Sequence, residues 1–228
     1  MGDLEEWQEE KEPPALSAAG IAKQNSYLLR RYGDFRRAAD AVAAAWQNRP
    51  EVAAVALIGS VAVAPWKEVP RFSPYRRKRI ELWHECKDLD LALWLTDLGS
   101  LNALRGAKDL ALRRMLEGDD IGVASHQADV FIFEPGTDRY LGRLCQFNRC
   151  PKEKAPCLVP GCGTTKFLQQ HQDFTWQQDA LAEDRIARLF DRSSGLIARA
   201  VDLPLPEGSG DAQHHKQPAT RPARIISP

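Results

Sequence analysis

Two aspartates, Asp88 and Asp90, interrupt the apolar segment KDLDLALWL, with one residue between them. In an extended strand residues i and i+2 point to the same side, so both carboxylates share one face. Leu89, Leu91 and Leu93 then point to the opposite face, where a core can cover them. Because adjacent like charges repel, the pattern indicates either a strand that begins at a hydrated rim or a site where cations hold the carboxylates.

Two other segments carry residues that suit a cation site. The apolar segment EVAAVALIGS ends in Gly59-Ser60, and such a turn lets the backbone approach a bound phosphate closely. A Gly-Ser pair is also an ordinary way to end a strand. Asp129 opens a third apolar segment, ADVFIF. If that strand lies beside the second one, three carboxylates converge on one rim of the sheet.

Three clustered carboxylates repel one another unless cations lie between them. Hard divalent ions such as Mg²⁺ take oxygen ligands and often share them with substrate phosphates. Two such ions, roughly 4 Å apart, stabilise the attacking and leaving oxygens of a phosphoryl transfer. The Gly-Ser turn, the paired aspartates and the third aspartate therefore predict a metal site that binds a phosphate group.

In their order, the segments LIGS, KDLDLAL and ADVFIF resemble the signature of the nucleotidyltransferase superfamily, which is related in fold to DNA polymerase beta. The resemblance places Gly59 and Ser60 in the turn that binds the nucleotide phosphates. It assigns Asp88 and Asp90 to the paired metal ligands and Asp129 to the third carboxylate. These three aspartates are thus the expected catalytic residues.

The resemblance spans roughly residues 52–134 and implies transfer of a nucleoside monophosphate from NTP to an acceptor, with release of pyrophosphate. Two Mg²⁺ or Mn²⁺ ions held by Asp88 and Asp90 would grip the triphosphate. Asp129 would complete one metal site and help to deprotonate the acceptor hydroxyl. The acceptor class stays open between a small molecule, a protein and an RNA end.

A function of a different class remains as the alternative. The chain would then be a non-catalytic module that keeps the fold and binds nucleotide or nucleic acid, with a zinc-stabilised interaction surface. All three acidic positions are filled. Since a binding module has no need to tolerate their repulsion, the sequence favours the enzyme.

An insertion, residues 61–87, separates the Gly-Ser turn from the paired aspartates, where the family has a short helix. Three prolines prevent one continuous helix across it. Its basic and aromatic residues interleave: Trp66, Arg71, Phe72, Tyr75, Arg76, Arg77, Lys78 and Arg79. Such a segment beside a metal site can hold triphosphate or a nucleic-acid strand. The alternative is a solvated loop whose aromatic residues anchor it to the domain.

Four cysteines lie within eighteen residues, in the segment CQFNRCPKEKAPCLVPGCG: Cys145, Cys150, Cys157 and Cys162. Four thiolates at this density suit tetrahedral Zn²⁺, and His171 is a possible replacement for one of them. A complete set of four leaves no open coordination position, so we expect a structural zinc. Buried thiols without metal or a redox pair are the alternatives.

The elements that position these residues predict an α+β fold (α/β-like), with a small mixed β-sheet packed by helices and a zinc-stapled loop region. The predicted organisation runs as a loose N-terminus over 1–14, N-terminal helices over 15–48, a nucleotidyltransferase-like core over 49–140, a cysteine-rich segment with a C-terminal helix over 141–202, and a flexible tail over 203–228. Gly33 is expected to separate the two N-terminal helices, with Asp34 capping the second. A helix in LNALRGAKDLALRRMLEG is expected to end at Gly118.

Bulk composition adds little about partners. The 228 residues carry 31 Lys and Arg against 31 Asp and Glu, so the global charge points to no partner. We expect no membrane span, because no apolar run is long enough. The acidic N-terminus lacks the order of a signal peptide, which favours a cytoplasmic protein.

Overall fold

The computed structural model describes residues 17–68, 73–147, 150, 165–170 and 174–205. The expectations for residues 1–14 and for Cys157, Cys162, His171, Arg71 and Phe72 therefore lie outside the described residues, as does most of the predicted tail. The longer elements are α1 (Ala18–Trp46), β1 (Val52–Ile58), β4 (Leu89–Leu95), α3 (Leu101–Asp119), β5 (Ala128–Phe133), β6 (Tyr140–Leu144) and β8 (Ala187–Asp191). The shorter ones are η1 (Gly59–Val61), β2 (Lys67–Glu68), α2 (Ser73–Arg77), β3 (Leu82–Trp83), η2 (Ser125–Gln127), β7 (Leu168–Gln169), η4 (Gln178–Leu181), β9 (Gly195–Leu196) and η5 (Ala200–Asp202).

The main sheet has seven strands in the order β7-β6-β5-β4-β1-β8-β9. Strands β4 and β5 pair in parallel, and every other neighbouring pair in it is antiparallel. The parallel pair is joined by α3, as a parallel connection requires a crossover. The predicted α+β class and mixed sheet are confirmed, although the sheet is larger than the three predicted strands.

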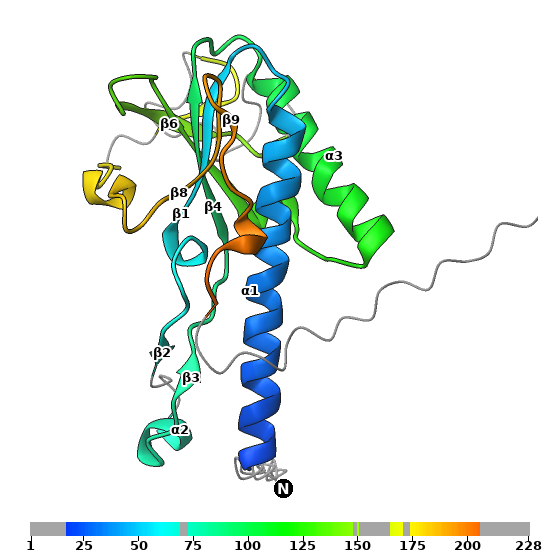
Figure 1. Cartoon of the computed structure of the whole chain (residues 1–228), viewed down its shortest axis with the longest axis vertical. Coiled ribbons are helices and arrows are strands. Elements are labelled where there is room, and N and C mark those ends of the chain that lie inside the picture. The colour runs from blue at the N-terminus through cyan, green and yellow to red at the C-terminus, as the bar shows by residue number, and fades with distance from the viewer. Residues whose placement is uncertain (1–16, 69–72, 148–149, 151–164, 171–173, 206–228) are drawn as a thin grey trace, which may run out of the picture.

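Helices α1 and α3 pack against each other and cover one face of this sheet (Figure 1). That face contains the main core, in which Leu89, Leu91 and Leu93 are fully buried. The Trp46 indole Nε1 on α1 donates to the Leu104 carbonyl on α3 at 2.9 Å, which fixes the two helices side by side. The leucines of the acidic strand are therefore the residues that anchor it.

The second face of the sheet is covered differently. Trp94 and Phe133 are buried there, and the side chains of Trp176 and Leu181 pack on them from the segment that leads to β8. Trp94 alternates with the buried leucines along β4, so its side chain and that of Asp90 leave the strand on this second face. The acidic rim therefore lies on the sheet face away from α1 and α3.

The structure corrects three helix predictions. Helix α1 runs through Gly33 without a break, and Asp34 instead pairs with Arg37 at 2.6 Å. Its buried stripe continues in register on both sides of the glycine, so packing outweighs the modest helix penalty of Gly33. Helix α3 passes Gly118 and ends at Asp119, because Asp120 takes the left-handed conformation at the C-cap.

The third correction concerns the predicted C-terminal helix in DFTWQQDALAEDRIARLFDR. This segment holds η4, a single short 3₁₀ turn, followed by β8, which pairs antiparallel with β1. Leu189 and Phe190 are buried in the core once β8 occupies that edge of β1. Tertiary strand pairing thus overrides the local helix preference of the sequence.

The described part of the insertion, residues 61–68 and 73–87, forms a projecting arm, and we use the name for these residues. Strands β2 and β3 pair antiparallel in it, and α2 lies at its far end, away from the main sheet (Figure 1). The Trp83 backbone N–H donates to the Asn25 side chain of α1 at 3.1 Å, so the arm is fastened along the N-terminal half of that helix. Among the described residues, no helix is long and apolar enough to cross a membrane.

Candidate functional site

Asp90 and Asp129 occupy matching positions on β4 and β5. The two strands are parallel and directly paired, and Asp90 is the register partner of Asp129. Side chains at matching positions of neighbouring strands leave the sheet on the same side. Folding therefore brings these two carboxylates to the same rim, which is the condition on which the predicted acidic cluster depended.

Burial and like charges together raise the pKa of Asp90 to about 6. Removal from water is the largest cause, and the charges of Asp129 and Asp88 follow. The Arg143 guanidinium acts in the opposite direction and lowers this pKa. Asp88 is exposed and precedes the first residue of β4, so it completes the acidic rim from its solvent side.

Gly59 packs directly against Asp90. Its backbone has φ of +70°, and a Cβ built on it would lie 2.5 Å from Asp90 Oδ2. Two independent constraints, conformation and space, thus require glycine at this position. The predicted Gly-Ser turn is thus in contact with Asp90. Burial raises the pKa of the Cys86 thiol, and a hydrogen bond with Ser60 acts in the opposite direction.

Helix α1 holds the chain that follows this turn. Arg36 is buried, and its Nε donates to the Val61 carbonyl at 3.4 Å. The Tyr32 hydroxyl donates to the Val63 carbonyl. The Arg36 guanidinium also donates through Nη1 to the Leu203 carbonyl at 2.5 Å, which connects the C-terminal segment to the turn. Sequence reasoning missed Arg36, whose one available signal was a charged residue beside the apolar stripe of α1.

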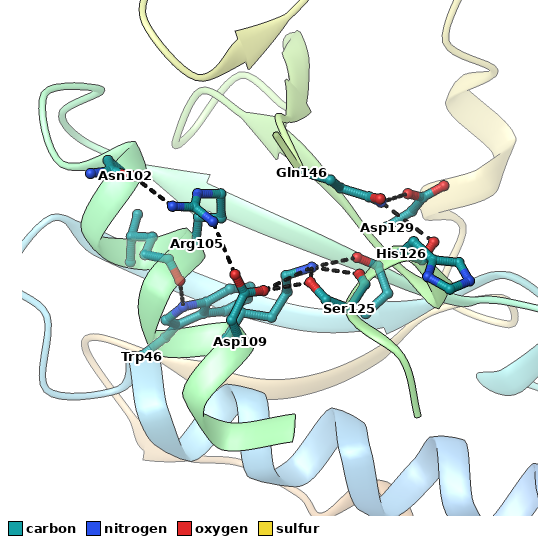
Figure 2. Close-up of polar contacts among 11 residues, drawn as sticks. Trp46, Asn102, Arg105, Asp109, Ser125, His126, Asp129 and Gln146 are labelled. Carbon is teal, nitrogen blue, oxygen red and sulfur yellow. Dashed lines mark hydrogen bonds and ion pairs between the residues drawn. The ribbon is translucent and has the colours of Figure 1, made fainter. Parts of the chain in front are cut away.

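Asp129 is already engaged by two side chains that sequence reasoning also missed. Arg143 Nη1 lies 2.8 Å from Asp129 Oδ2. Gln146 Nε2 donates to Asp129 Oδ1 at 2.7 Å (Figure 2). Arg143 lies on β6 and is the register partner of Phe131 on β5. Phe131 is two residues beyond Asp129 on the same strand. Strand alternation in the segment YLGRL was the available signal for Arg143, but only once β6 is known to pair with β5.

A buried lysine holds the turn that leads into β5. Lys108 Nζ on α3 donates to the Ser125 carbonyl at 2.8 Å and to the Ala128 carbonyl at 3.2 Å. Asp109 accepts a hydrogen bond from the Ser125 hydroxyl in the same network (Figure 2). Because Ala128 immediately precedes Asp129, these contacts position the third carboxylate.

The acidic rim offers the ligand chemistry that Mg²⁺ prefers, since its donors are carboxylate oxygens. Burial is the main cause of the raised pKa of Asp90, and the charges of Asp129 and Asp88 add to it, so a cation at the rim would favour the ionised carboxylate. In the described part of the chain, no three His, Cys, Asp or Glu side chains are grouped as a ready metal site. Each oxygen of Asp129 already has one partner, Arg143 or Gln146, so an ion at Asp129 would share the carboxylate with them or displace one of them.

Two of the four predicted zinc ligands are described, and both lie at the backbone of Phe167. The Cys145 N–H donates to the Phe167 carbonyl at 2.8 Å, and the Phe167 N–H donates to Cys150 Sγ at 3.4 Å. Cys145 is buried, and Cys150 is partly exposed. The zinc prediction stays a prediction, because Cys157, Cys162 and His171 lie outside the described residues.

Comparison of the chain with protein families, with curated proteins and with solved structures found no match.

Proposed function

We propose that the protein is a metal-dependent nucleotidyltransferase, which transfers a nucleoside monophosphate from NTP to an acceptor and releases pyrophosphate. The observation that carries the proposal is the register of Asp90 with Asp129, combined with the packing of Gly59 against Asp90. These residues come from three separate segments of the sequence. Their contact supports the proposal, because the Gly-Ser turn then lies beside the pair of aspartates, as a site for a metal-bound phosphate requires.

In this proposal the acceptor hydroxyl oxygen attacks the α-phosphorus of NTP. A new P–O bond forms, the bond between the α-phosphorus and its bridging oxygen breaks, and pyrophosphate leaves with the electron pair. Two Mg²⁺ or Mn²⁺ ions, held by Asp88, Asp90 and Asp129, would neutralise the phosphate charge. Asp129 takes up the hydroxyl proton, and Gly59 leaves room for the phosphates beside its backbone.

Arg143 has a second part in the proposal. Its ion pair with Asp129 holds that carboxylate in place before substrate arrives. If Asp129 bound the metal, the Arg143 guanidinium would be free at the same rim to bind a phosphate oxygen, for which its geometry is well suited. We also propose that Cys145, Cys150, Cys157 and Cys162 bind a structural zinc that staples the loop after β6.

The test uses the full chain and its thermal unfolding with each NTP, with and without Mg²⁺. We expect NTP to raise the melting temperature only when Mg²⁺ is present, and Asp90→Asn to abolish this shift. Asp184→Asn, an exposed carboxylate outside the rim, is the matched control and should keep it. Incubation with labelled NTP, Mg²⁺ and a cell extract should then label the acceptor with the wild type and with Asp184→Asn, but not with Asp90→Asn. Label transfer by Asp90→Asn at the wild-type rate would refute the assignment.

A second candidate, a non-catalytic nucleotide- or nucleic-acid-binding module, is favoured by one observation. Both oxygens of Asp129 are already bound, by Arg143 and by Gln146, as in a structural ion pair. A module of this kind would bind its ligand equally well in EDTA. Stabilisation by NTP that is independent of Mg²⁺, together with no labelled product, would support this candidate over the enzyme.

A further inference from the structure

The arm is joined to the acidic rim at both of its ends. It leaves the sheet directly after Gly59-Ser60 and returns to it at Asp88. Its tip, α2, lies far from the sheet along the N-terminal half of α1 (Figure 1). A ligand that lies along the arm therefore ends at the rim, whereas a single nucleotide bound at the rim does not extend to α2.

The arm concentrates positive charge in a chain that is neutral as a whole. The arm contains six Lys and Arg against three Glu, while the whole chain has 31 of each sign. Four of these cations are consecutive at the C-terminal end of α2, and all are exposed: Arg76, Arg77, Lys78 and Arg79. None of the four forms an ion pair with a described carboxylate. Such uncompensated charge favours a polyanion.

Aromatic rings accompany these cations along the arm. Trp66 is 60% exposed, and its ring stacks on that of His84 with 5.6 Å between centroids and 17° between planes. Lys67 Nζ lies over the Trp83 ring, 5.0 Å from its centroid. The stack holds Trp66 in a fixed orientation while one side of the arm stays open to solvent. An ordered, exposed indole beside lysine and arginine is suited to stacking with an unpaired base.

We infer that the arm binds single-stranded nucleic acid and guides its end to the rim. The acceptor in the proposed reaction is then a nucleic-acid end, and this assignment of the acceptor rests on the proposed function. Binding to the arm itself does not depend on catalysis. Single strands fit better than duplex because Trp66 can stack only on an exposed base. An acidic protein would use the charges and leave the exposed indole without a role.

The test is the binding of a fluorescent single-stranded RNA, about 20 nucleotides long to exceed a typical site of about 4–16, measured by anisotropy in EDTA without NTP. Arg76→Gln with Arg77→Gln should weaken binding about tenfold and reduce the slope of log affinity against log salt by about 1.4. Arg113→Gln with Arg114→Gln is the matched control, because these exposed arginines on α3 form no ion pair with a described residue. It should change neither quantity by more than a factor of about two.

Trp66 supplies the second arm of the test. Trp66→Ala should weaken RNA binding about tenfold, and Trp66→Phe should retain most of it because a ring remains for stacking. Unchanged affinity in both Arg76/Arg77 and Trp66→Ala variants would overturn the inference. Equal displacement of the RNA by polyglutamate, with no effect of Trp66→Ala, would also overturn it in favour of an acidic protein partner.

The inference and the proposed function fail separately. RNA binding measured in EDTA without NTP includes no step of the reaction, so it reports on the arm apart from catalysis. If RNA binds but no nucleoside monophosphate is transferred to it, RNA binding by the arm stands and the assignment of RNA as the acceptor is wrong. If Mg²⁺-dependent NTP stabilisation is seen but no RNA binds, the reaction site stands and the arm assignment is wrong.

Discussion

Asp90 on β4 lies in register with Asp129 on β5, so the sheet itself holds the two carboxylates next to each other. No rotation of either side chain can take it to the other face of the sheet. The repulsion is a fixed property of the fold and is only partly offset by Arg143. A site of this kind lowers the stability of the metal-free protein, and binding of a cation raises that stability.

Asp90→Asn should therefore stabilise the metal-free protein while it removes the proposed activity. The amide keeps the shape of the carboxyl group. It does not repel Asp129, and it has no charge whose burial costs free energy. We expect a rise of about 2–3 kcal/mol in the free energy of unfolding, measured by urea denaturation in EDTA at pH 7.5. The exposed control Asp184→Asn should stay within about 0.5 kcal/mol of the wild type. Destabilisation by Asp90→Asn would show that the carboxylate is a structural hydrogen-bond acceptor.

The pH dependence of stability should carry the same signature. The folded-state pKa of Asp90 is raised from 3.8 to about 6, so the folded protein binds this proton more tightly than the unfolded chain. The ionised Asp90 therefore lowers the free energy of unfolding by its full amount above pH 6. This loss becomes smaller as the pH falls from about 6 towards 4, because the folded protein takes up the proton first. The difference between Asp90→Asn and the wild type, measured in EDTA, should shrink by about 2 kcal/mol between pH 7.5 and pH 4.5. A difference that is constant across this range would contradict the raised pKa.

Gly59→Ala should disturb the rim through contact with Asp90. The substitution forces an alanine to φ of +70° and places its Cβ 2.5 Å from Asp90 Oδ2. Gly136→Ala is the matched control, because Gly136 has φ of +80° but nothing within 4 Å of its added Cβ. Both should lose about 1 kcal/mol from backbone strain, and Gly59→Ala should lose about 1–2 kcal/mol more. Equal losses in urea denaturation would mean that the turn moves away from Asp90 without penalty.

Zinc should be present at about one equivalent per chain in protein purified without chelator, and its removal should lower the melting temperature. Cys150→Ser should abolish zinc binding, since Cys150 Sγ already faces the backbone of Phe167 beside Cys145. Cys86→Ser is the control, because Cys86 contacts Ser60 at the base of the arm, away from these cysteines. Native mass spectrometry measures all three proteins. A wild-type protein without zinc would leave the cysteines as thiols or as a redox pair.

The strands of the site were predictable because local pattern determines them. Apolar runs ending in Gly-Ser or opening with aspartate mark β1, β4 and β5, and their buried residues are set by alternation. The contact of Gly59 with Asp90 follows once those strands pair. The residues around the site were not predictable in this way. Arg143 reaches Asp129 only because β6 pairs with β5, and Arg36 reaches Val61 only because α1 lies across the turn.

The errors in the fold have the same origin. The segment that ends in β8 has the composition of a helix, but its leucine and phenylalanine fill an edge of β1 that no local pattern reveals. Gly33 is a plausible break in an isolated peptide and is tolerated because the buried stripe of α1 continues past it. Contacts distant in sequence thus decide both the errors in the fold and the missing residues of the site.

Arg143→Ala should move metal affinity and nucleotide affinity in opposite directions. Removing the guanidinium frees Asp129 Oδ2, with which it pairs at 2.8 Å, and leaves the rim more negative. We therefore expect Mg²⁺ alone to bind about fivefold more tightly and Mg²⁺-NTP to bind about fivefold more weakly, since a phosphate contact is lost. Magnesium titrations of the melting temperature, with and without NTP, measure both effects. Arg139→Ala is the control, because Arg139 pairs with Glu134 at 2.9 Å on the surface and should alter neither affinity. If Arg143→Ala weakens Mg²⁺ binding as well, Arg143 serves to hold Asp129 in its binding position and does not compete with the metal.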